Sequence, residues 1–201
     1  MIVIIDYGMG NLGSILNMCK FLNIEACISD DIESIANAKK IILPGVGSFD
    51  SAMESIKKMG MQEILNKKAL EEKIPFLGIC LGMQLLTNSS QEGSLPGLGW
   101  VDAEVIKFPQ SPLLKVPHIG WNKAKPEKSD PMVEGLQEES KFYFVHSYFV
   151  KTNKNENSLM KTKYGVTFDS AISKDNIYGF QFHPEKSHKY GMKILKNFSE
   201  I

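Results

Sequence analysis

The sequence GICLG at residues 78–82 places a cysteine between two glycines and between two apolar segments of different character. Residues 74–79 before it are short and apolar, as a buried strand of a parallel sheet is, and residues 81–87 after it have helical spacing. A Gly-x-Cys-x-Gly turn from strand to helix is the sulfur version of a nucleophile elbow, where small neighbours permit a strained backbone. The pattern predicts Cys80 at a helix N-terminus above the sheet, which favours the thiolate. A packed structural cysteine is the alternative for this stretch alone.

The composition excludes several classes of protein. The 201 residues carry 23 basic and 23 acidic side chains, so charge gives no reason to expect a nucleic acid or an acidic membrane as partner. Every basic residue is a lysine, which excludes a bidentate arginine clamp within the chain. No apolar stretch has the length of a membrane span, and residues 1–6 lack the basic segment of a signal peptide. The three cysteines lack Cys-x-x-Cys spacing, so we expect a cytoplasmic protein without disulfides.

Strands and helices alternate in the first half of the chain. We expect strands at residues 2–6, 25–29, 40–43 and 74–79, and a polar helix or turn at 31–37. Helices are expected at 11–22, from about 49 to 59, in a further segment that ends near 71, and at 81–87. Ser48 or Asp50 is the expected N-cap of the helix that ends near Met59. This alternation predicts an α/β fold with a mostly parallel central sheet flanked by helices.

The second half of the chain has a different pattern. After a loop rich in Ser, Gly and Pro at 88–99, short β-like runs follow at 100–108, 142–150, 158–163, 170–173 and 177–182, and a closing helix at 190–198. No repeat or linker divides the chain. We therefore expect residues 1–201 to form one domain with a β-rich second half.

Residues 8–13, GMGNLG, match the Gly-x-Gly-x-x-Gly pattern of dinucleotide-binding loops between a strand and a helix. Asp30 and Asp31 lie where a ribose-binding acid would be expected. Against this alternative, Asp6 and Tyr7 lengthen the turn, and the second half offers no recognisable hydride-transfer chemistry. We therefore favour a glycine loop that packs tightly beside the sheet.

The sequence QFHPE at residues 181–185 supplies a base for the cysteine. Residues two apart in an extended chain point to the same side, and Pro184 favours extension at His183. The Glu185 carboxylate can then hydrogen-bond one ring nitrogen of His183 and leave the other free as a base. A surface histidine with a chance acidic neighbour is the alternative for this motif alone, whereas together with Cys80 it completes a triad. The other histidines lack metal-ligand spacing, and no metal is predicted.

A thioester mechanism also needs hydrogen-bond donors for the oxyanion. The Leu81 N–H, just after the nucleophile, is one. The second is expected from PGVG at residues 44–47, at the end of a neighbouring strand, where Val46 and Gly47 can turn a peptide toward the site. A plain strand terminator is the alternative for this loop.

Five motifs carry a resemblance to a known family. They are PGVG at 44–47, GICLGMQ at 78–84, PHIGWN at 117–122, YFVHSY at 143–148 and GFQFHPEKS at 179–187. In this order, and nearly from end to end of the chain, they resemble the class I (triad) glutamine amidotransferases. The PHIGWN and HSY motifs resemble, within that superfamily, the glutaminase subunits of imidazole glycerol phosphate synthase.

The resemblance implies hydrolysis of glutamine to glutamate and ammonia, without a cofactor. It implies that Cys80 is the nucleophile, that His183 protonates the departing ammonia and that Glu185 orients His183. The residues that it implies for holding the glutamine, with Glu92 on the substrate ammonium, are Gly47, Gln84, Glu92, Ser147 and Tyr148.

The resemblance also implies a partner. Trp121, Asn122, Tyr143 and Lys186 are expected to face a (β/α)₈-barrel synthase subunit in a heterodimer, through which ammonia travels. The complex would then make imidazole glycerol phosphate and AICAR in histidine biosynthesis. A paralogous glutaminase that feeds a surface-glycan sugar amidotransferase is the alternative, since its glutaminase half would look the same.

Overall fold

The computed structural model describes residues 1–112 and 114–201. Its strands are β1 (Ile2–Ile5), β2 (Ala26–Ser29), β3 (Lys40–Leu43), β4 (Phe76–Ile79), β5 (Ser89–Ser90), β6 (Ala103–Lys107), β7 (His118–Lys123), β8 (Lys125–Pro126), β9 (Lys141–His146), β10 (Tyr148–Thr152), β11 (Ser158–Tyr164), β12 (Val166–Lys174) and β13 (Ile177–Phe180). The helices are α1 (Leu12–Phe21), α2 (Ile32–Ala36), α3 (Phe49–Lys58), α4 (Met61–Asn66), α5 (Leu81–Leu85) and α6 (His188–Glu200). A π-helical turn at Lys67–Glu71 extends α4, which accounts for the helix expected up to residue 71.

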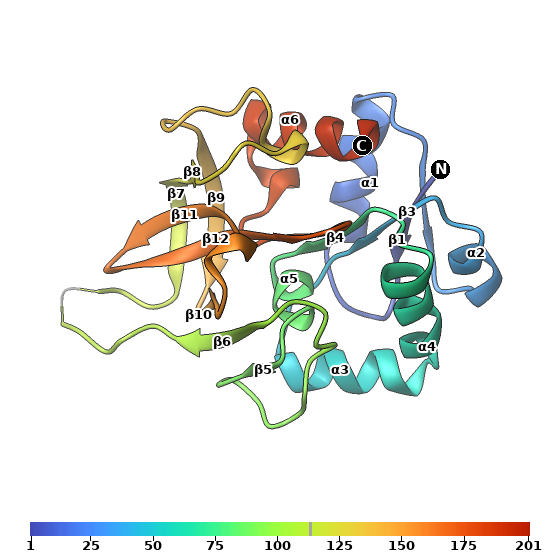
Figure 1. Cartoon of the computed structure of the whole chain (residues 1–201), viewed down its shortest axis with the longest axis horizontal. Helices are drawn as coiled ribbons and strands as arrows, with labels where there is room; N and C mark the ends of the chain where they lie inside the picture. The colour runs from blue at the N-terminus through green and yellow to red at the C-terminus, as the bar shows by residue number, and fades with distance from the viewer. Residues whose placement is uncertain (113) are drawn as a thin grey trace.

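One large mixed sheet runs through the described part of the chain, in the order β2-β1-β3-β4-β13-β12-β10-β6-β5 (Figure 1). The strands from β2 to β13 are parallel. From β13 through β12 and β10 to β6 they are antiparallel, and β11 pairs with β12 outside this row. The predicted α/β fold with a β-rich second half is confirmed, with the parallel strands gathered in one half of the sheet.

Alternating residues of the parallel strands divide the core into two layers. Val3, Ile41 and Phe76 face a layer closed by α2, α3, α4 and α5. Their neighbours Ile4 and Ile42 face a second layer, closed by α1 and α6. Figure 1 shows these two groups of helices on opposite faces of the sheet. Parallel strands buried on both faces read as continuous apolar runs, which is why they were recognisable in the sequence.

Besides the short strands β5 and β8, which were not predicted, and an earlier start of β12, the second half differs from the expectation at residues 142–150 and at β7. The run at 142–150 is two strands, because the chain leaves a two-stranded sheet with β7 after His146 and enters the large sheet at Tyr148. Ser147 lies between them. The sequence analysis missed β7 altogether, since only His118 of its residues is buried and the strand includes Gly120 and Asn122, which strands disfavour.

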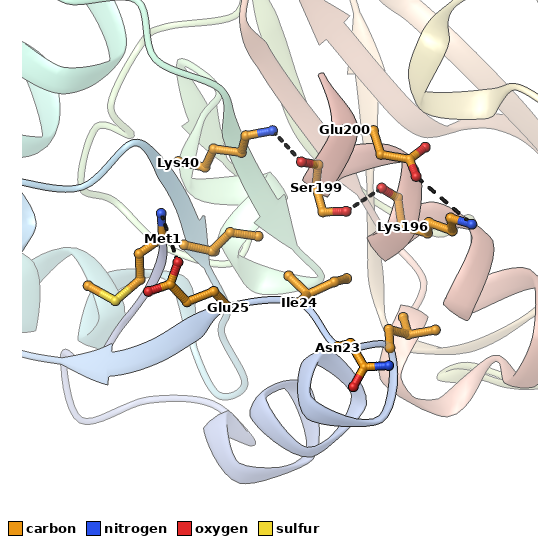
Figure 2. A pocket seen from close by; sticks show the side chains of 10 residues that line it. Met1, Asn23, Ile24, Glu25, Lys40, Lys196, Ser199 and Glu200 are labelled. Carbon is orange, nitrogen blue, oxygen red and sulfur yellow. Dashed lines mark hydrogen bonds and ion pairs between the residues drawn. The ribbon is translucent and has the colours of Figure 1, made fainter.

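Helix ends are closed by side chains from distant parts of the chain. Lys40 donates to the carbonyls of Phe198 (3.1 Å), Ser199 (2.7 Å) and Ile201, which have no partner within α6. Figure 2 shows Lys40 in a pocket that residues 1–2 and 22–25 line together with Lys196, Ser199 and Glu200 of this helix end. At α3, Ser48 holds the predicted N-cap position without capping through its side chain, and Phe49 donates to Glu92 instead. None of the helices in residues 1–112 and 114–201 is long and apolar enough to cross a bilayer.

Candidate active site

The predicted turn at Cys80 is present between β4 and α5. Cys80 has φ 55° and ψ −110°, a strained conformation for a residue with a side chain. A Cβ at Gly82 would lie 1.8 Å from the Leu43 carbonyl oxygen, and one at Gly78 would lie 2.7 Å from the Gly82 backbone. Only glycine fits at either position, so the two glycines let the elbow pack directly on β3 and hold the cysteine at its tip.

The site lies at the carboxyl ends of the parallel strands, where open α/β sheets bind their ligands. The loop 44–47 leaves β3 beside the elbow, and Gly45 packs so closely on Leu81 that a Cβ there would be 2.9 Å from the Leu81 Cβ. Tyr7, which follows β1, donates its hydroxyl hydrogen to the Pro44 carbonyl at 2.6 Å, and burial raises its pKa. The loop beside the elbow is thus fixed from behind.

The glycine loop 8–13 also packs against this region. Gly10 has φ +111°, and a Cβ there would lie 3.3 Å from Pro44. This close approach explains the glycine without a nucleotide and agrees with the tightly packed loop that the sequence favoured.

His183 and Glu185 form a buried pair. The Nδ1 of His183 lies 2.8 Å from Oε1 of Glu185, and the side chains are 3% and 2% exposed. Burial lowers the pKa of the His183 imidazole, but interactions with Cys80 and Glu185 outweigh it and raise this pKa to about 10. The other ring nitrogen, Nε2, is buried and has no hydrogen-bond partner among the described residues. The arrangement is an imidazolium held at Nδ1 by a carboxylate, a form that can deliver a proton from Nε2.

A pocket of about 320 Å³ opens over the elbow. It is lined by Val46, Gly47, Cys80, Leu81, Gln84, Glu92, Pro117, Val145, His146, Ser147, Tyr148 and His183. Every residue predicted for the oxyanion or for glutamine is on this wall. Glu185 lies behind His183, where it contacts the ring without lining the pocket.

Gln181 is a polar side chain of the site to which the sequence analysis gave no role. Gln181 accepts a hydrogen bond from Gln84 Nε2 at 3.0 Å, and its own amide lies 3.8 Å from the Cys80 sulfur. Gln84 also donates to the Tyr148 carbonyl at 3.2 Å. Gln84, which is 5% exposed, therefore braces the pocket wall. Gln181 stands two residues before His183, and the two-residue period of an extended chain was the signal that could have found it.

A chain of hydrogen bonds runs behind the pocket. His146 Nδ1 lies 2.7 Å from the Tyr148 carbonyl, which can only accept, so this nitrogen carries the hydrogen. His118 Nδ1 then donates to His146 Nε2 at 2.9 Å, and Asn122 donates to His118 Nε2 at 3.3 Å. Burial lowers the pKa of His118 to about 4 and that of His146 to about 3. Both rings are therefore neutral near pH 7, as the chain of donors requires.

Four of the large exposed hydrophobic residues, here called the apolar rim, run from the pocket along β7. Val46 (45% exposed) lines the pocket, Val116 (39%) precedes the lining residue Pro117, and Ile119 (58%) and Trp121 (47%) follow on β7. Trp121 meets Tyr143 edge to face at 6.1 Å between ring centroids, and Lys186 Nζ lies 5.8 Å above the Tyr143 ring. Asn122 is half-buried and donates to the Lys163 carbonyl at 3.1 Å. Three of the four residues predicted for the partner thus share one cluster of contacts.

In residues 1–112 and 114–201 no group of three or more His, Cys, Asp or Glu side chains could hold a metal ion. Cys19, Cys27 and Cys80 are free thiols.

Comparison with known proteins gives the family. A family model, glutamine amidotransferase class-I, matches residues 3–201. The chain belongs to this family. It is therefore an enzyme of the glutaminase type, as the resemblance of its motifs indicated.

Curated relatives match it over nearly their whole length. The chain is 57% identical over 198 residues to "Imidazole glycerol phosphate synthase subunit HisH 2" of Methanococcus maripaludis, covering 98% of each chain. It is 46% identical to the subunit of the same name from Pseudomonas aeruginosa, over 100% of both. Among solved structures, one titled "Crystal structure of glutamine amidotransferase" superposes with a TM-score of 0.75 at 19% identity, covering 98% of this chain and 97% of that one, and supports the fold.

Proposed function

We propose that this chain is the glutaminase subunit of an imidazole glycerol phosphate synthase, and that it hydrolyses glutamine with a Cys80–His183–Glu185 triad. The observation that carries the proposal is one pocket lined by an elbow cysteine and by the histidine of a buried His–Glu pair. Residues 1–201 act as one glutamine amidotransferase unit, which the match over 3–201 supports.

In the first half of the reaction the Cys80 sulfur attacks the side-chain amide carbon of glutamine while His183 Nε2 holds the proton of the thiol, since interactions with Cys80 and Glu185 raise the pKa of His183 to about 10. The oxyanion that forms accepts hydrogen bonds from the Leu81 N–H and from a backbone N–H of Val46 or Gly47. His183 then gives its proton to the amide nitrogen, the C–N bond breaks and ammonia leaves. The carboxylate of Glu185 stabilises the charged imidazolium in the transition state.

In the second half water cleaves the thioester. His183 Nε2 takes a proton from the water, the hydroxide adds to the thioester carbon, and the C–S bond breaks to release glutamate. Cys80 leaves as the thiolate and His183 keeps its proton, so that the enzyme returns to its starting state.

The remaining pocket residues hold the substrate. Glu92 is the carboxylate on the pocket wall and takes the α-ammonium of glutamine, while Ser147 and Tyr148, which line the same pocket, contact the rest of the substrate. Gln84 acts from behind, through the Tyr148 carbonyl that it holds.

We propose that the apolar rim receives the synthase subunit, a (β/α)₈ barrel, in a heterodimer. Exposed aromatic and aliphatic side chains that gather beside a catalytic pocket are typical of a surface covered by a partner. Trp121, Asn122, Tyr143 and Lys186 take part in this contact, and ammonia passes directly from the pocket into the barrel. We propose a cytoplasmic setting for the complex, which the free thiols support.

The names of the relatives favour the histidine pathway over the surface-glycan alternative, in which the same glutaminase would serve a sugar amidotransferase. No contact in the described residues favours a dinucleotide at the loop 8–13, whose glycine at position 10 lies against Pro44.

The experiment compares Cys80→Ala with the wild type, each mixed with the synthase subunit. We expect Cys80→Ala to abolish glutamate release from glutamine and to leave ammonia-dependent synthesis intact. Cys19→Ala, which removes a buried thiol of α1 outside the pocket, is the matched control and should keep both activities. Glutamine hydrolysis by Cys80→Ala at the normal rate would exclude the triad.

A further inference from the structure

The N-terminus of α3 and the loop 90–95 exchange hydrogen bonds in both directions. The Phe49 N–H, the first of the helix, donates to Oε2 of Glu92 at 2.9 Å. Asp50, the next residue of the helix, accepts from the Ser94 N–H at 2.9 Å and from the Leu95 N–H at 3.0 Å. Glu92 of the loop therefore accepts from a backbone N–H of the helix, and Asp50 of the helix accepts from backbone N–H groups of the loop.

Asp50 is tied to this loop by several bonds. The Ser94 hydroxyl also donates to it, at 3.2 Å, and the backbone bonds from Ser94 and Leu95 lower the pKa of the Asp50 carboxyl. A Cβ at Gly93 would lie 2.0 Å from Oδ1 of Asp50. The carboxylate thus occupies the space that any larger residue at position 93 would need.

This contact lies between two parts of the pocket. Glu92 lines it directly, and α3 begins two residues after Gly47, which lines it from the oxyanion loop. One oxygen of Glu92 is committed to the Phe49 N–H, which fixes the direction of the carboxylate. Whatever holds the loop 90–95 against α3 therefore sets where Glu92 stands relative to the oxyanion loop.

We infer that Asp50 is a positioning residue for the α-ammonium subsite: it acts through the loop 90–95 to hold Glu92 where the ammonium of glutamine is recognised. The inference rests on the proposed function, because it takes glutamine as the substrate and Glu92 as its ligand. Through this role Asp50 helps the enzyme select amides that carry an α-ammonium over amides that lack one.

The test measures the rates at which two reagents alkylate Cys80 in the presence of the synthase subunit. Intact-protein mass spectrometry follows the reaction. One reagent is 6-diazo-5-oxonorleucine, which carries the ammonium and carboxylate of glutamine, and the other is iodoacetamide, which carries neither. We expect Asp50→Ala to slow the first reaction about tenfold or more, since hydrogen bonds to a charged group are worth at least that factor. The iodoacetamide rate should stay at the wild-type value. Glu92→Gln is the positive reference and should show the same selective loss.

Conservative and paired variants separate positioning from damage. Asp50→Asn keeps one acceptor oxygen and should fall between wild type and Asp50→Ala. Gly93→Ala should slow the diazo reagent because its methyl group collides with Asp50, and adding it to Asp50→Ala should cause no further loss. Asp31→Ala removes a carboxylate that caps α2 outside the pocket, so it is the matched control and should leave both rates unchanged.

Three results would overturn the inference. One is a wild-type rate with the diazo reagent for Asp50→Ala, and another is an equal slowing of both reagents, which would mean general damage to the site. The third is additive losses for Asp50→Ala and Gly93→Ala. The proposed function fails separately, if wild-type Cys80 reacts with iodoacetamide and not with the glutamine analogue.

Discussion

The buried histidine pair behind the pocket predicts a specific loss of stability in acid. His118 is 2% exposed, and burial lowers its pKa from 6.5 to about 4. A group whose pKa is lower in the folded than in the unfolded state binds a proton more readily when unfolded. Above pH 6.5 such a histidine is neutral in both states and does not lower the free energy of unfolding. As the pH falls from 6.5 toward the pKa of the folded state, the unfolded state gains the proton first, and the free energy of unfolding decreases.

The size of the loss follows from the two pKa values. At pH 5 the unfolded histidine is almost fully protonated and His118 is not, which favours unfolding by about 2 kcal/mol relative to pH 7. His146, with a pKa lowered to about 3, contributes a similar amount. The pair together should remove about 4 kcal/mol, a large part of the stability of an ordinary domain.

His118→Phe isolates one of the two contributions. The ring of His118 is stacked between Phe144 and Tyr164, with centroids 4.7 and 3.9 Å away, so phenylalanine fits the same slot. The variant leaves His146 Nε2 without its donor and should be about 1–3 kcal/mol less stable at pH 7. Between pH 7 and pH 5, however, it should lose about 2 kcal/mol less than the wild type.

The assay is equilibrium urea unfolding at pH 7 and pH 5, with refolding checked at both. The assay compares the change in unfolding free energy between pH 7 and pH 5 in the variant with the same change in the wild type. Contributions from titratable groups that both proteins share therefore cancel. His188→Gln is the control, since this histidine is exposed and its ring stacks on Trp121, apart from the buried pair. If His118→Phe lost as much stability as the wild type between the two pH values, the neutral histidine pair would be refuted.

Three further predictions test other parts of the structure. Gly82→Ala places a methyl group against the Leu43 carbonyl, so we expect urea unfolding to show about 3 kcal/mol of destabilisation or a protein that does not fold. Gly13→Ala is the control, because there is open space around Gly13, and it should be neutral or stabilising. Glu185→Gln removes the charge beside His183, and kcat for glutamine should fall about tenfold with little change in KM; an unchanged kcat would contradict it. Lys40→Met leaves the last carbonyls of α6 without a donor and should lower the free energy of unfolding by about 1–3 kcal/mol, and equal stability would contradict the helix-capping role.

The parallel half of the fold and the candidate catalytic motifs could be predicted for the same reason, because the sequence signals for both lie within a few neighbouring residues. The elbow glycines and the His-x-Glu spacing report backbone geometry within a few residues, and the strands of the parallel half are apolar runs. The break at Ser147 and the strand β7 were not recognisable, because they depend on which sheet each segment joins.

The support of the site lies outside what local patterns can predict. Asp50 bonds a loop 44 residues away in the chain, and Gln84 reaches Gln181 across 97 residues. Ser48 and Asp50 both suit a helix N-cap, so composition alone could not indicate that Glu92 would close the helix and that Asp50 would hold the loop.

The central claim is that Cys80 releases ammonia which a partner chain consumes, and isotope transfer tests it most directly. The chain is mixed with the synthase subunit and supplied with glutamine labelled with ¹⁵N at the side-chain amide, and the nitrogen product is analysed by mass spectrometry in the presence of unlabelled ammonium. We predict that the wild type incorporates the label in preference to the ammonium in solution, and that Cys80→Ala incorporates only the unlabelled ammonium. Label in the product of Cys80→Ala, or none in that of the wild type, would contradict the account.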